Sequence, residues 1–390
     1  MTRRFSWDGV DDPPAGSLHG VRVLDFSRIL AGPYLTMLYG DLGAKVIKVE
    51  RAEGDDTRRW GPPFAQGEAT YFWGSNRNKH SIVLDLKNHD DRALALELAE
   101  TADVVVENFR PGVMDRLGLG YEDILKTNPG VVFCSISAFG DSPAAADLAG
   151  YDLLVQAVGG LMSITGTDES GPIKVGVALV DVLASLHAAV GVLAALRHRD
   201  ATGEGQRVEV TLLQALLASL TNQATAYLGT GESPARIGNQ HPSIAPYQTI
   251  RAADGEVALA CGNDRQFQNL CRVLGLEGVG TSEEFGTNSA RVVNRAALIE
   301  HIEEVTAELT ASEVIDRLTG AGVPVGPVND IAEAFATAAI YGLEPRIDIT
   351  AGDRTVPQVT SPMRLSRTPV RYYLPPPRLP AAHGEEGPNA

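Results

Sequence analysis

The fold is decided by a stretch that runs Val21-Arg-Val-Leu-Asp-Phe26, Ser27-Arg-Ile-Leu-Ala-Gly-Pro33 and, after a further apolar segment, Ala44-Lys-Val-Ile-Lys-Val-Glu50. Its first and last parts are short apolar runs of the kind that form buried strands. Pro33 suits the first turn of a helix, where its missing N–H costs nothing. The stretch therefore predicts a strand, a turn over residues 27–32, a helix to about Leu42 and a second strand.

The same alternation continues beyond this stretch. Further strands are predicted at Ser81–Asp85, Ala102–Glu107 and Val131–Ile136, with a helix over Asp90–Glu100 and a short one from Val113. Strands that alternate with helices at this spacing indicate a parallel sheet covered by helices on both faces. Ligands bind such sheets beyond the carboxyl ends of the strands. That rule directs attention to the loops at residues 27–32, 51–56, 108–112 and 137–140.

The pattern changes after Gly150, where the chain becomes mainly helical up to about Tyr227. A polar linker follows over Gly229–Gln240. The turn signal Ala252-Ala-Asp-Gly255 then lies between two apolar runs and predicts a hairpin. Helices beyond it complete a second unit, which we expect to be a smaller α+β domain.

Composition excludes some classes of function. The chain has 390 residues and a formal net charge of −16, which argues against nucleic acid as a general partner. Its 44% hydrophobic and 21% charged residues are ordinary for a soluble protein. The longest apolar helical run ends at Arg197-His-Arg199, so we expect no membrane-spanning segment. Residues 1–14 are polar and do not resemble a signal peptide.

The cysteine and histidine residues predict neither disulfides nor a metal site. Cys134, Cys261 and Cys271 are widely spaced, without a paired or metal-binding spacing, and the histidines do not cluster. This pattern fits a reducing compartment, and we expect the cytoplasm.

Two of the ligand-facing loops carry candidate binding residues, and each of these residues also has a structural interpretation. Ala31-Gly32 permits close approach of an anion to the N–H groups of the next helix, although an ordinary turn accounts for the pair equally well. Arg51 stands where doubly wound folds meet a ribose, and an arginine there favours a phosphate. The alternative is a surface arginine paired with Asp55 or Asp56.

The loop Asn108-Phe-Arg-Pro-Gly112 combines several chemistries at the same edge. Its amide can contact a base or an amide group, Phe109 can stack, and Arg110 with Arg116 can neutralise phosphates. A solvated loop is the alternative. Lys79, Lys87 and Arg77 add positive charge nearby, so this acidic chain is predicted to bind a small polyanion at one edge of its sheet.

Asp181 lies in Gly176-Val-Ala-Leu-Val-Asp181, directly before the long apolar segment Val182–Leu196. From this stretch alone, a helix N-cap is the favoured interpretation. The alternative is a reactive carboxylate in a dry site near a helix N-terminus.

Five ordered motifs resemble the class III CoA-transferase family, which includes formyl-CoA transferase, carnitine CoA-transferase and α-methylacyl-CoA racemase. They are Val23-Leu-Asp-Phe26 with Ala31-Gly-Pro33, then Gly40–Glu50, Asn78–Lys87, Asp103–Gly112 and Gly150–Gly160. The resemblance implies an α/β fold with a Rossmann-like large domain and a smaller α+β domain, in an interlocked homodimer. It also implies a large-domain part at 1–228, a linker and small domain at 229–328, and a return segment with the C-terminal tail at 329–390.

The resemblance also assigns the site. It makes Asp181 the nucleophile and implies coenzyme A contacts at Leu30, Ala31, Arg51, Leu84, Asp85, Leu86, Lys87, Asn108, Phe109, Arg110 and Arg116. The formyl-CoA transferase branch has Gln in place of Leu30 and Lys in place of Ser137, and it has a glycine run that this chain lacks. These departures argue against oxalate and formate as substrates. The racemase branch has Gly-His-Asp where this chain has Gly150-Tyr-Asp152, and tyrosine is a poor proton carrier at neutral pH.

The predicted activity is therefore transfer of CoA from an acyl-CoA to a small carboxylic acid through an aspartyl–acyl anhydride. We expect the helix N-terminus to keep Asp181 ionised, and Gly159-Gly160 to offer N–H donors to the oxyanion. Three alternatives stay open: an acyl-CoA racemase or epimerase, an NAD-dependent dehydrogenase and a non-catalytic CoA-binding protein. The absence of GxGxxG weighs against the dehydrogenase.

Overall fold

The computed structural model describes residues 5–145 and 148–380, and the chain divides by its internal contacts into two units. The larger unit comprises residues 1–161, 175–232 and 344–390, and the smaller unit comprises residues 162–174 and 233–343. Residues 1–4 of the predicted large-domain part and residues 381–390 of the predicted C-terminal tail lie outside the described residues. The domain boundaries expected at 228 and 328 stay a prediction.

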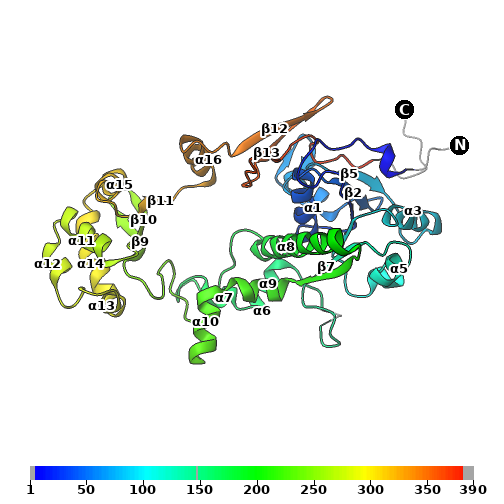
Figure 1. Cartoon of the computed structure of the whole chain (residues 1–390). Helices are drawn as coiled ribbons and strands as arrows, with labels where there is room; N and C mark the ends of the chain where they lie inside the picture. Colours follow the sequence, from blue (N-terminus) through cyan, green and yellow to red (C-terminus); the bar gives the residue numbers. More distant parts are fainter. Residues whose placement is uncertain (1–4, 146–147, 381–390) are drawn as a thin grey trace. The chain divides into compact units, whose positions relative to one another are not determined.

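The larger unit is built on a six-stranded sheet in which every neighbouring pair is parallel (Figure 1). The strand order is β5-β2-β1-β6-β7-β8. Chain order therefore reverses between β1 and β6, as it does between the two halves of a Rossmann fold. The predicted α/β parallel sheet is confirmed. The strands are β1 Arg22–Asp25, β2 Lys45–Glu50, β5 His80–Val83, β6 Val104–Glu107, β7 Val132–Ser137 and β8 Gln206–Thr211.

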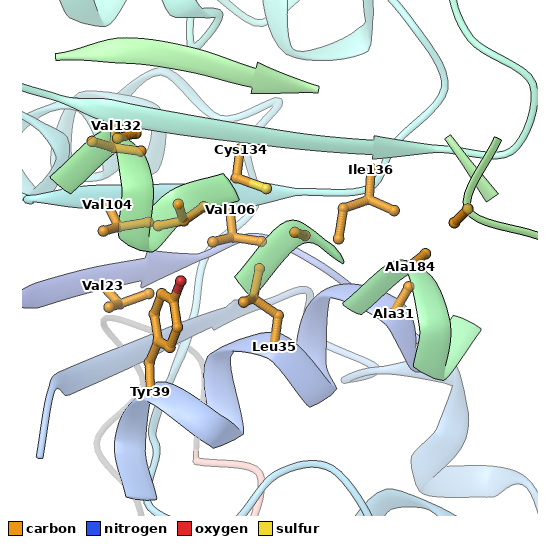
Figure 2. Close-up of a cluster of buried hydrophobic side chains, with 14 of the residues drawn as sticks. Val23, Ala31, Leu35, Tyr39, Val104, Val106, Val132, Cys134, Ile136 and Ala184 are labelled. Atoms are coloured by element: carbon orange, nitrogen blue, oxygen red, sulfur yellow. The ribbon is translucent and has the colours of Figure 1, made fainter. Parts of the chain in front are cut away.

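Helices cover both faces of this sheet because alternate strand residues are apolar on each side. On one face, Val104 and Val106 of β6 belong to a buried apolar cluster that also contains Leu35 of α1 and Ala184 of α8 (Figure 2). On the other face, Val105 packs in a cluster with α3, α4 and α5. The helices of the larger unit are α1 Ala31–Asp41, α2 Thr70–Trp73, α3 His89–Ala99, α4 Val113–Arg116, α5 Tyr121–Leu125, α6 Asp152–Val158, α8 Leu179–Thr202, α9 Leu212–Ser219 and α10 Thr221–Thr230.

Helix α8 is the longest helix of the described chain and lies against α1, β7 and β8. Among the described residues it is the one helix that is long and apolar enough to cross a membrane. The expectation that no apolar run reaches this length is wrong, because the helix begins at Leu179 and not after Asp181. One side of α8 is buried on the sheet, as in the core helix of a soluble protein.

Two structural features of the chain were not predicted. The segment Tyr151–Ile164 was expected as one helix, but it breaks at Gly159-Gly160 into α6 and α7 Leu161–Ile164. Near the C-terminus, β12 Arg346–Ala351 and β13 Arg354–Val359 pair as an antiparallel hairpin. The short strands β3 Phe64–Ala65 and β4 Glu68–Ala69 and the 3-10 turns Trp7–Gly9 and Asp56–Arg59 complete the larger unit.

The smaller unit packs helices on a three-stranded antiparallel sheet of order β11-β10-β9, with strands β9 Tyr247–Ala252, β10 Gly255–Ala260 and β11 Val325–Pro327. The predicted hairpin is β9–β10, and it turns at Ala253-Asp254. Its core centres on Val257, Phe267 and Leu298. The helices are α11 Asp264–Val273, α12 Glu277–Thr281, α13 Asn288–Val293, α14 Arg295–Thr306, α15 Ala311–Gly320 and α16 Ile331–Ile340.

Candidate active site

The loops that follow β1 and β6 are joined to each other at the point where the strand order reverses. The Asn108 side chain accepts the backbone N–H of Arg28 at 2.8 Å and donates to the Arg28 carbonyl oxygen at 2.7 Å. The Arg28 guanidinium also lies over the Phe109 ring, 4.9 Å from its centroid. The Asn108 amide therefore holds the first loop in place, a role that the sequence analysis did not assign to it.

Glycine is required at the turn between β1 and α1. A Cβ atom at Gly32 would lie 2.2 Å from the Ser27 side chain, so no larger residue fits without a shift of the loop. Ile29 has a left-handed φ of 72°. Its N–H donates to the Asp55 carboxylate at 3.2 Å, which helps to hold this strained residue in place. The first loop is thus fixed from both sides, by Asn108 and by Asp55.

Asp181 lies in the first turn of α8, but it is not the N-cap of the helix. The N-cap residue is Ala178, without a side-chain cap of its own. Asp152, the first residue of α6, supplies the acceptor instead: its Oδ1 accepts the N–H of Val180 at 2.7 Å and that of Asp181 at 3.4 Å. The cap interpretation of Asp181 is therefore wrong, because a carboxylate from another helix occupies that role and leaves the Asp181 side chain free to face a cavity.

Asp181 lines a cavity of about 230 Å³ together with the loops that follow β1, β6 and β7. Of the predicted site residues, the structure brings Leu30, Ala31, Asn108, Phe109, Arg110 and Asp181 together at this cavity. Arg28, Ser137, Phe139 and Tyr151 also line it. Gly150 and Ala138 form part of the cavity wall and pack closely there. A Cβ atom at position 150 would lie 2.0 Å from the Cβ atom of Ala138, so a larger residue would require a shift of this wall.

The electrostatics at Asp181 differ from the expectation. Burial, and after it the negative charge of Asp152, raises the pKa of Asp181 from 3.8 to about 7. The favourable effect of a helix N-terminus on a carboxylate is outweighed here, because Asp152 already caps the same N–H groups. Tyr71 of α2 belongs to this environment, since burial and then the charges of Asp181 and Asp152 raise its pKa.

A second cavity, of about 250 Å³, lies beside the ends of β2 and β5 and shares Arg28 and Phe109 with the first. Predicted residues that line it are Arg51, Leu84, Asp85, Leu86 and Lys87. Arg51 pairs with Asp56, as the surface alternative foresaw, and lies 3.6 Å from Glu53. Arg116 lies in α4 beside Gly112 and lines neither of these two cavities.

Two of the three cations that were predicted to add positive charge near the ligand-binding edge of the sheet do not face a ligand. Lys79 is buried and its Nζ lies 3.2 Å from the Asp25 carboxylate, while Arg77 pairs with Asp41 at 2.6 Å. Both side chains are buried and paired with internal carboxylates, so they are not presented to a ligand. Among the described residues, the cations at this edge include Arg28, Arg51, Lys87, Arg110 and the exposed Arg116.

The structure does not support Gly159-Gly160 as oxyanion donors, and it adds two residues that the sequence analysis did not single out. Gly159 closes α6 by donating its N–H to Val155 at 2.8 Å, and neither glycine lines the cavity of Asp181. Asp152 and Gln156 were missed as functional candidates, although their spacing of four residues places both side chains on one face of a helix. Among residues 5–145 and 148–380, no group of three or more His, Cys, Asp or Glu side chains is placed to hold a metal ion.

The chain is similar in sequence to proteins that are named as CoA-transferases. The chain is 43% identical to succinate–glutarate CoA-transferase of Agrobacterium fabrum, across 93% of this chain and 92% of that protein. It is 40% identical to human succinyl-CoA:glutarate CoA-transferase, across 93% and 83%. It is 41% identical to acetyl-CoA:oxalate CoA-transferase of Acetobacter aceti, across 82% and 83%.

Solved structures and a family model lead to the same result. A CAIB/BAIF family protein from Brucella suis matches with a TM-score of 0.84 and 42% identity, covering 95% of this chain and 97% of that one. A hypothetical protein from Mycobacterium tuberculosis matches with a TM-score of 0.84 and 30% identity, covering 96% and 99%. The model of CoA-transferase family III matches residues 18–383. The resemblance inferred from five motifs is confirmed, and the chain belongs to CoA-transferase family III.

Proposed function

We propose that the chain moves CoA from an acyl-CoA thioester to a small dicarboxylic acid through an anhydride on Asp181. Membership of the family makes the chain an enzyme that transfers CoA between a thioester and a carboxylate. The observation that carries the assignment to Asp181 is its position. Its carboxyl group lines the same cavity as the loops after β1 and β6, where ligands of this sheet type bind.

Each proposed step exchanges one bond for another. An Asp181 oxygen attacks the thioester carbonyl carbon, and the C–S bond breaks with its electron pair going to the CoA thiolate. An oxygen of the incoming carboxylate then attacks the Asp181 carbonyl carbon of the anhydride and expels the first acid as a carboxylate. The thiolate finally attacks the new acyl carbon, which forms the product thioester and regenerates Asp181.

The first turn of α1 offers the donors that an oxyanion needs, in place of the Gly159-Gly160 pair. Leu30 and Ala31 line the cavity of Asp181, and the first N–H groups of a helix have no partner within the helix. Pro33 has no N–H, so Ala31 and Gly32 are the donors of this turn. Donors held in this way stabilise developing negative charge without reorganisation.

Binding of CoA is proposed across the two neighbouring cavities. Arg110 at the first cavity and Lys87 at the second are cations suited to phosphate groups, and Phe109 is shared by both. Arg51 would exchange its contact with Asp56 for a phosphate. The exposed Arg116 would approach from α4. CoA enters and leaves as part of substrate and product, and no metal takes part in the proposed steps.

Succinate and glutarate are the proposed acids, since relatives at 40–43% identity are named for their transfer. Incubation with succinyl-CoA and isotopically labelled glutarate should give labelled glutaryl-CoA. Oxalate belongs in the acceptor panel because a relative at 41% identity is named for it, whereas Leu30 and Ser137 argue against it. Failure to transfer CoA between any donor and acceptor of the panel would contradict the proposed function.

Racemisation is the second candidate, because one observation bears on it directly. Tyr151 is 61% exposed and lines the cavity of Asp181, at the position where the racemase branch has histidine. An acid/base pair at the α-carbon would exchange its proton with solvent, whereas CoA transfer leaves that proton in place. We expect no deuterium at the α-carbon after turnover in heavy water.

An interlocked homodimer is proposed on the basis of the apolar side chains that α6 and α8 expose. Leu153, Leu154 and Val158 of α6 are 48–64% exposed, and Leu186 and Val190 of α8 are 45% and 69% exposed. Apolar surface of this kind on a soluble enzyme is typical of a protein interface. Light scattering after size-exclusion chromatography should give twice the mass of the 41.4 kDa chain, and a monomer would contradict the proposal.

We propose that the enzyme is cytoplasmic and has neither membrane nor nucleic-acid partners. Cys134, Cys261 and Cys271 are buried free thiols, which suits a reducing compartment. The net charge of −16 favours small cationic pockets over an extended nucleic-acid surface. Cell fractionation with an antibody against the chain would test the compartment.

A further inference from the structure

Asp152 and Gln156 form a buried polar pair beside the proposed nucleophile. Asp152 is 8% exposed and Gln156 is fully buried, one turn apart on α6. The Gln156 Nε2 donates to Asp152 Oδ2 at 2.6 Å. This bond leaves Asp152 Oδ1 directed at the N–H groups of Val180 and Asp181, at 2.7 and 3.4 Å.

Gln156 also holds the chain that leads into α8. Its Oε1 accepts the N–H of Val175 at 2.9 Å, and its Nε2 lies 3.4 Å from the Val177 carbonyl oxygen. The two side chains together therefore fix the segment from Val175 to Asp181 at both of its ends. Neither side chain lines the cavity that holds Asp181.

We propose that Asp152 and Gln156 are positioning residues for the CoA transfer, which hold the first turn of α8 so that the Asp181 carboxylate faces the thioester. The inference rests on the proposed role of Asp181. A nucleophile held in attack geometry gains rate because misplacement of about 1 Å costs roughly 100-fold. The two residues should therefore govern kcat far more than the KM for acyl-CoA.

Asp152 also brings a negative charge to the site, and this charge has a measurable consequence. The groups that face Asp181 are Asp152 from α6, Tyr71 from α2, Tyr151 before α6, and Arg28 and Arg110 across the cavity. Of these, Asp152 is the acid that raises the pKa of Asp181, after burial. Neutralising Asp152 should lower the pH at which Asp181 becomes reactive.

The test uses two single variants and their combination in the full-length protein. In Asp152→Asn, the amide oxygen is needed to accept the N–H of Val180, so the new N–H₂ group faces the N–H₂ group of Gln156. The hydrogen bond between the two side chains is then lost. Gln156→Glu sets two carboxylates against each other. The double variant Asp152→Asn with Gln156→Glu restores a donor opposite an acceptor, and a Glu oxygen still accepts the N–H of Val175. Asp8→Asn, at an aspartate whose side chain is 92% exposed, is the matched control for the loss of one charge.

We expect each single variant to lose roughly 10- to 100-fold in kcat with a nearly unchanged KM for acyl-CoA. The double variant should recover most of the loss. In Asp152→Asn, which removes the negative charge beside Asp181, the acid limb of the kcat profile should move down by about half a pH unit or more. Asp8→Asn should change neither quantity.

Two results would overturn the proposal: single variants with wild-type kcat and pH profile, or a double variant as slow as the slower single. Equal losses in kcat, CoA affinity and thermal midpoint in all variants would indicate a purely structural role and would also count against it. The wild-type enzyme in the same assay distinguishes failure of the positioning proposal from failure of the proposed function. If the wild type transfers no CoA, the proposed function is contradicted; if it does, the variants test the positioning role.

Discussion

Two carboxyl groups near the carboxyl ends of the sheet have opposite surroundings. Asp25, the last residue of β1, is fully buried, with Lys79 at 3.2 Å and hydrogen bonds from Ser27 and Thr36. Burial alone would raise the pKa of Asp25, but the charges of Lys79 and Lys48 bring it below 3.8. Asp181 has burial and a second carboxylate around it, and its pKa is raised to about 7.

The difference separates a structural carboxylate from a reactive one. A carboxylate that lies beside buried cations and accepts hydrogen bonds is favoured in its charged form and has little tendency to attack. A carboxylate that is partly desolvated, lies next to another acid and faces a cavity is destabilised in its charged form, as functional groups often are. Substitutions at Asp181 and at Asp25 should therefore have opposite consequences for activity and for stability.

The largest effect is expected for Asp181→Asn, because an amide cannot form the anhydride. Transfer between succinyl-CoA and glutarate should fall by about 1,000-fold or more. The rate is measured by mass spectrometry of the product thioester. Affinity for CoA, measured by calorimetry, should stay within a few-fold of the wild type, and transfer at more than a tenth of the wild-type rate would contradict the role of Asp181.

Replacement of Asp25 by Asn should act on stability. The substitution leaves Lys79 and Lys48 buried without one of their partners, which should lower the free energy of unfolding by roughly 3 kcal/mol at pH 7. Urea denaturation measures the change. The stability from Asp25 is present above pH 3.8, its unfolded pKa, and is lost as the pH falls through the lower folded value. An unchanged midpoint of unfolding would remove the basis of the comparison.

The dependence of transfer on pH should report the raised pKa of Asp181. Below pH 7 the rate should fall by about tenfold per pH unit, because the protonated carboxyl group is not a nucleophile. Above pH 8 the rate should level off. The profile is measured as kcat at saturating acyl-CoA, and a flat profile between pH 5 and 8 would contradict the raised pKa.

The smallest effect is a gain of stability in the same Asp181→Asn variant. A folded pKa above the unfolded value of 3.8 means that Asp181 favours folding only while protonated, so its contribution is lost as pH rises from 3.8 through about 7. Since the side chain is only half-buried, solvent screening reduces the effect. The variant should be more stable than the wild type by about 1 kcal/mol at pH 8 and nearly equal at pH 4. A variant less stable than the wild type at pH 8 would contradict the claim that the charged form of Asp181 is unfavourable in the folded protein.

Local pattern predicted the framework of this protein well. The strands near Val23, Val46, Val105 and Phe133 lie within a few residues of their predicted positions, because apolar runs and the helices between them are properties of neighbouring residues. The loops expected to face a ligand lie at the edge where the strand order reverses. The position of Asp181 at the start of a long helix was also predicted, from one acid before an apolar segment, although the helix begins two residues earlier, at Leu179.

Pairings between distant residues could not be predicted. The bond from Asp152 to the N–H of Val180 joins residues 28 apart, and the contact of Lys79 with Asp25 joins residues 54 apart. Whether Asp181 or another residue caps α8, and whether Lys79 meets a ligand or an internal acid, depends on which segments the fold brings together. Periodicity carries no information on those partners, so the cap of α8 and the charge at the edge were predicted wrongly.

The central claim is that Asp181 carries the acyl group, and trapping that group tests it most directly. The enzyme is incubated with succinyl-CoA and hydroxylamine, digested and analysed by mass spectrometry, with Asp181→Asn treated in parallel. Our account predicts a hydroxamate on the peptide that contains Asp181 in the wild type and its absence from the variant. A wild-type enzyme that transfers CoA yet forms no hydroxamate at Asp181, or forms one at another acid, would contradict it.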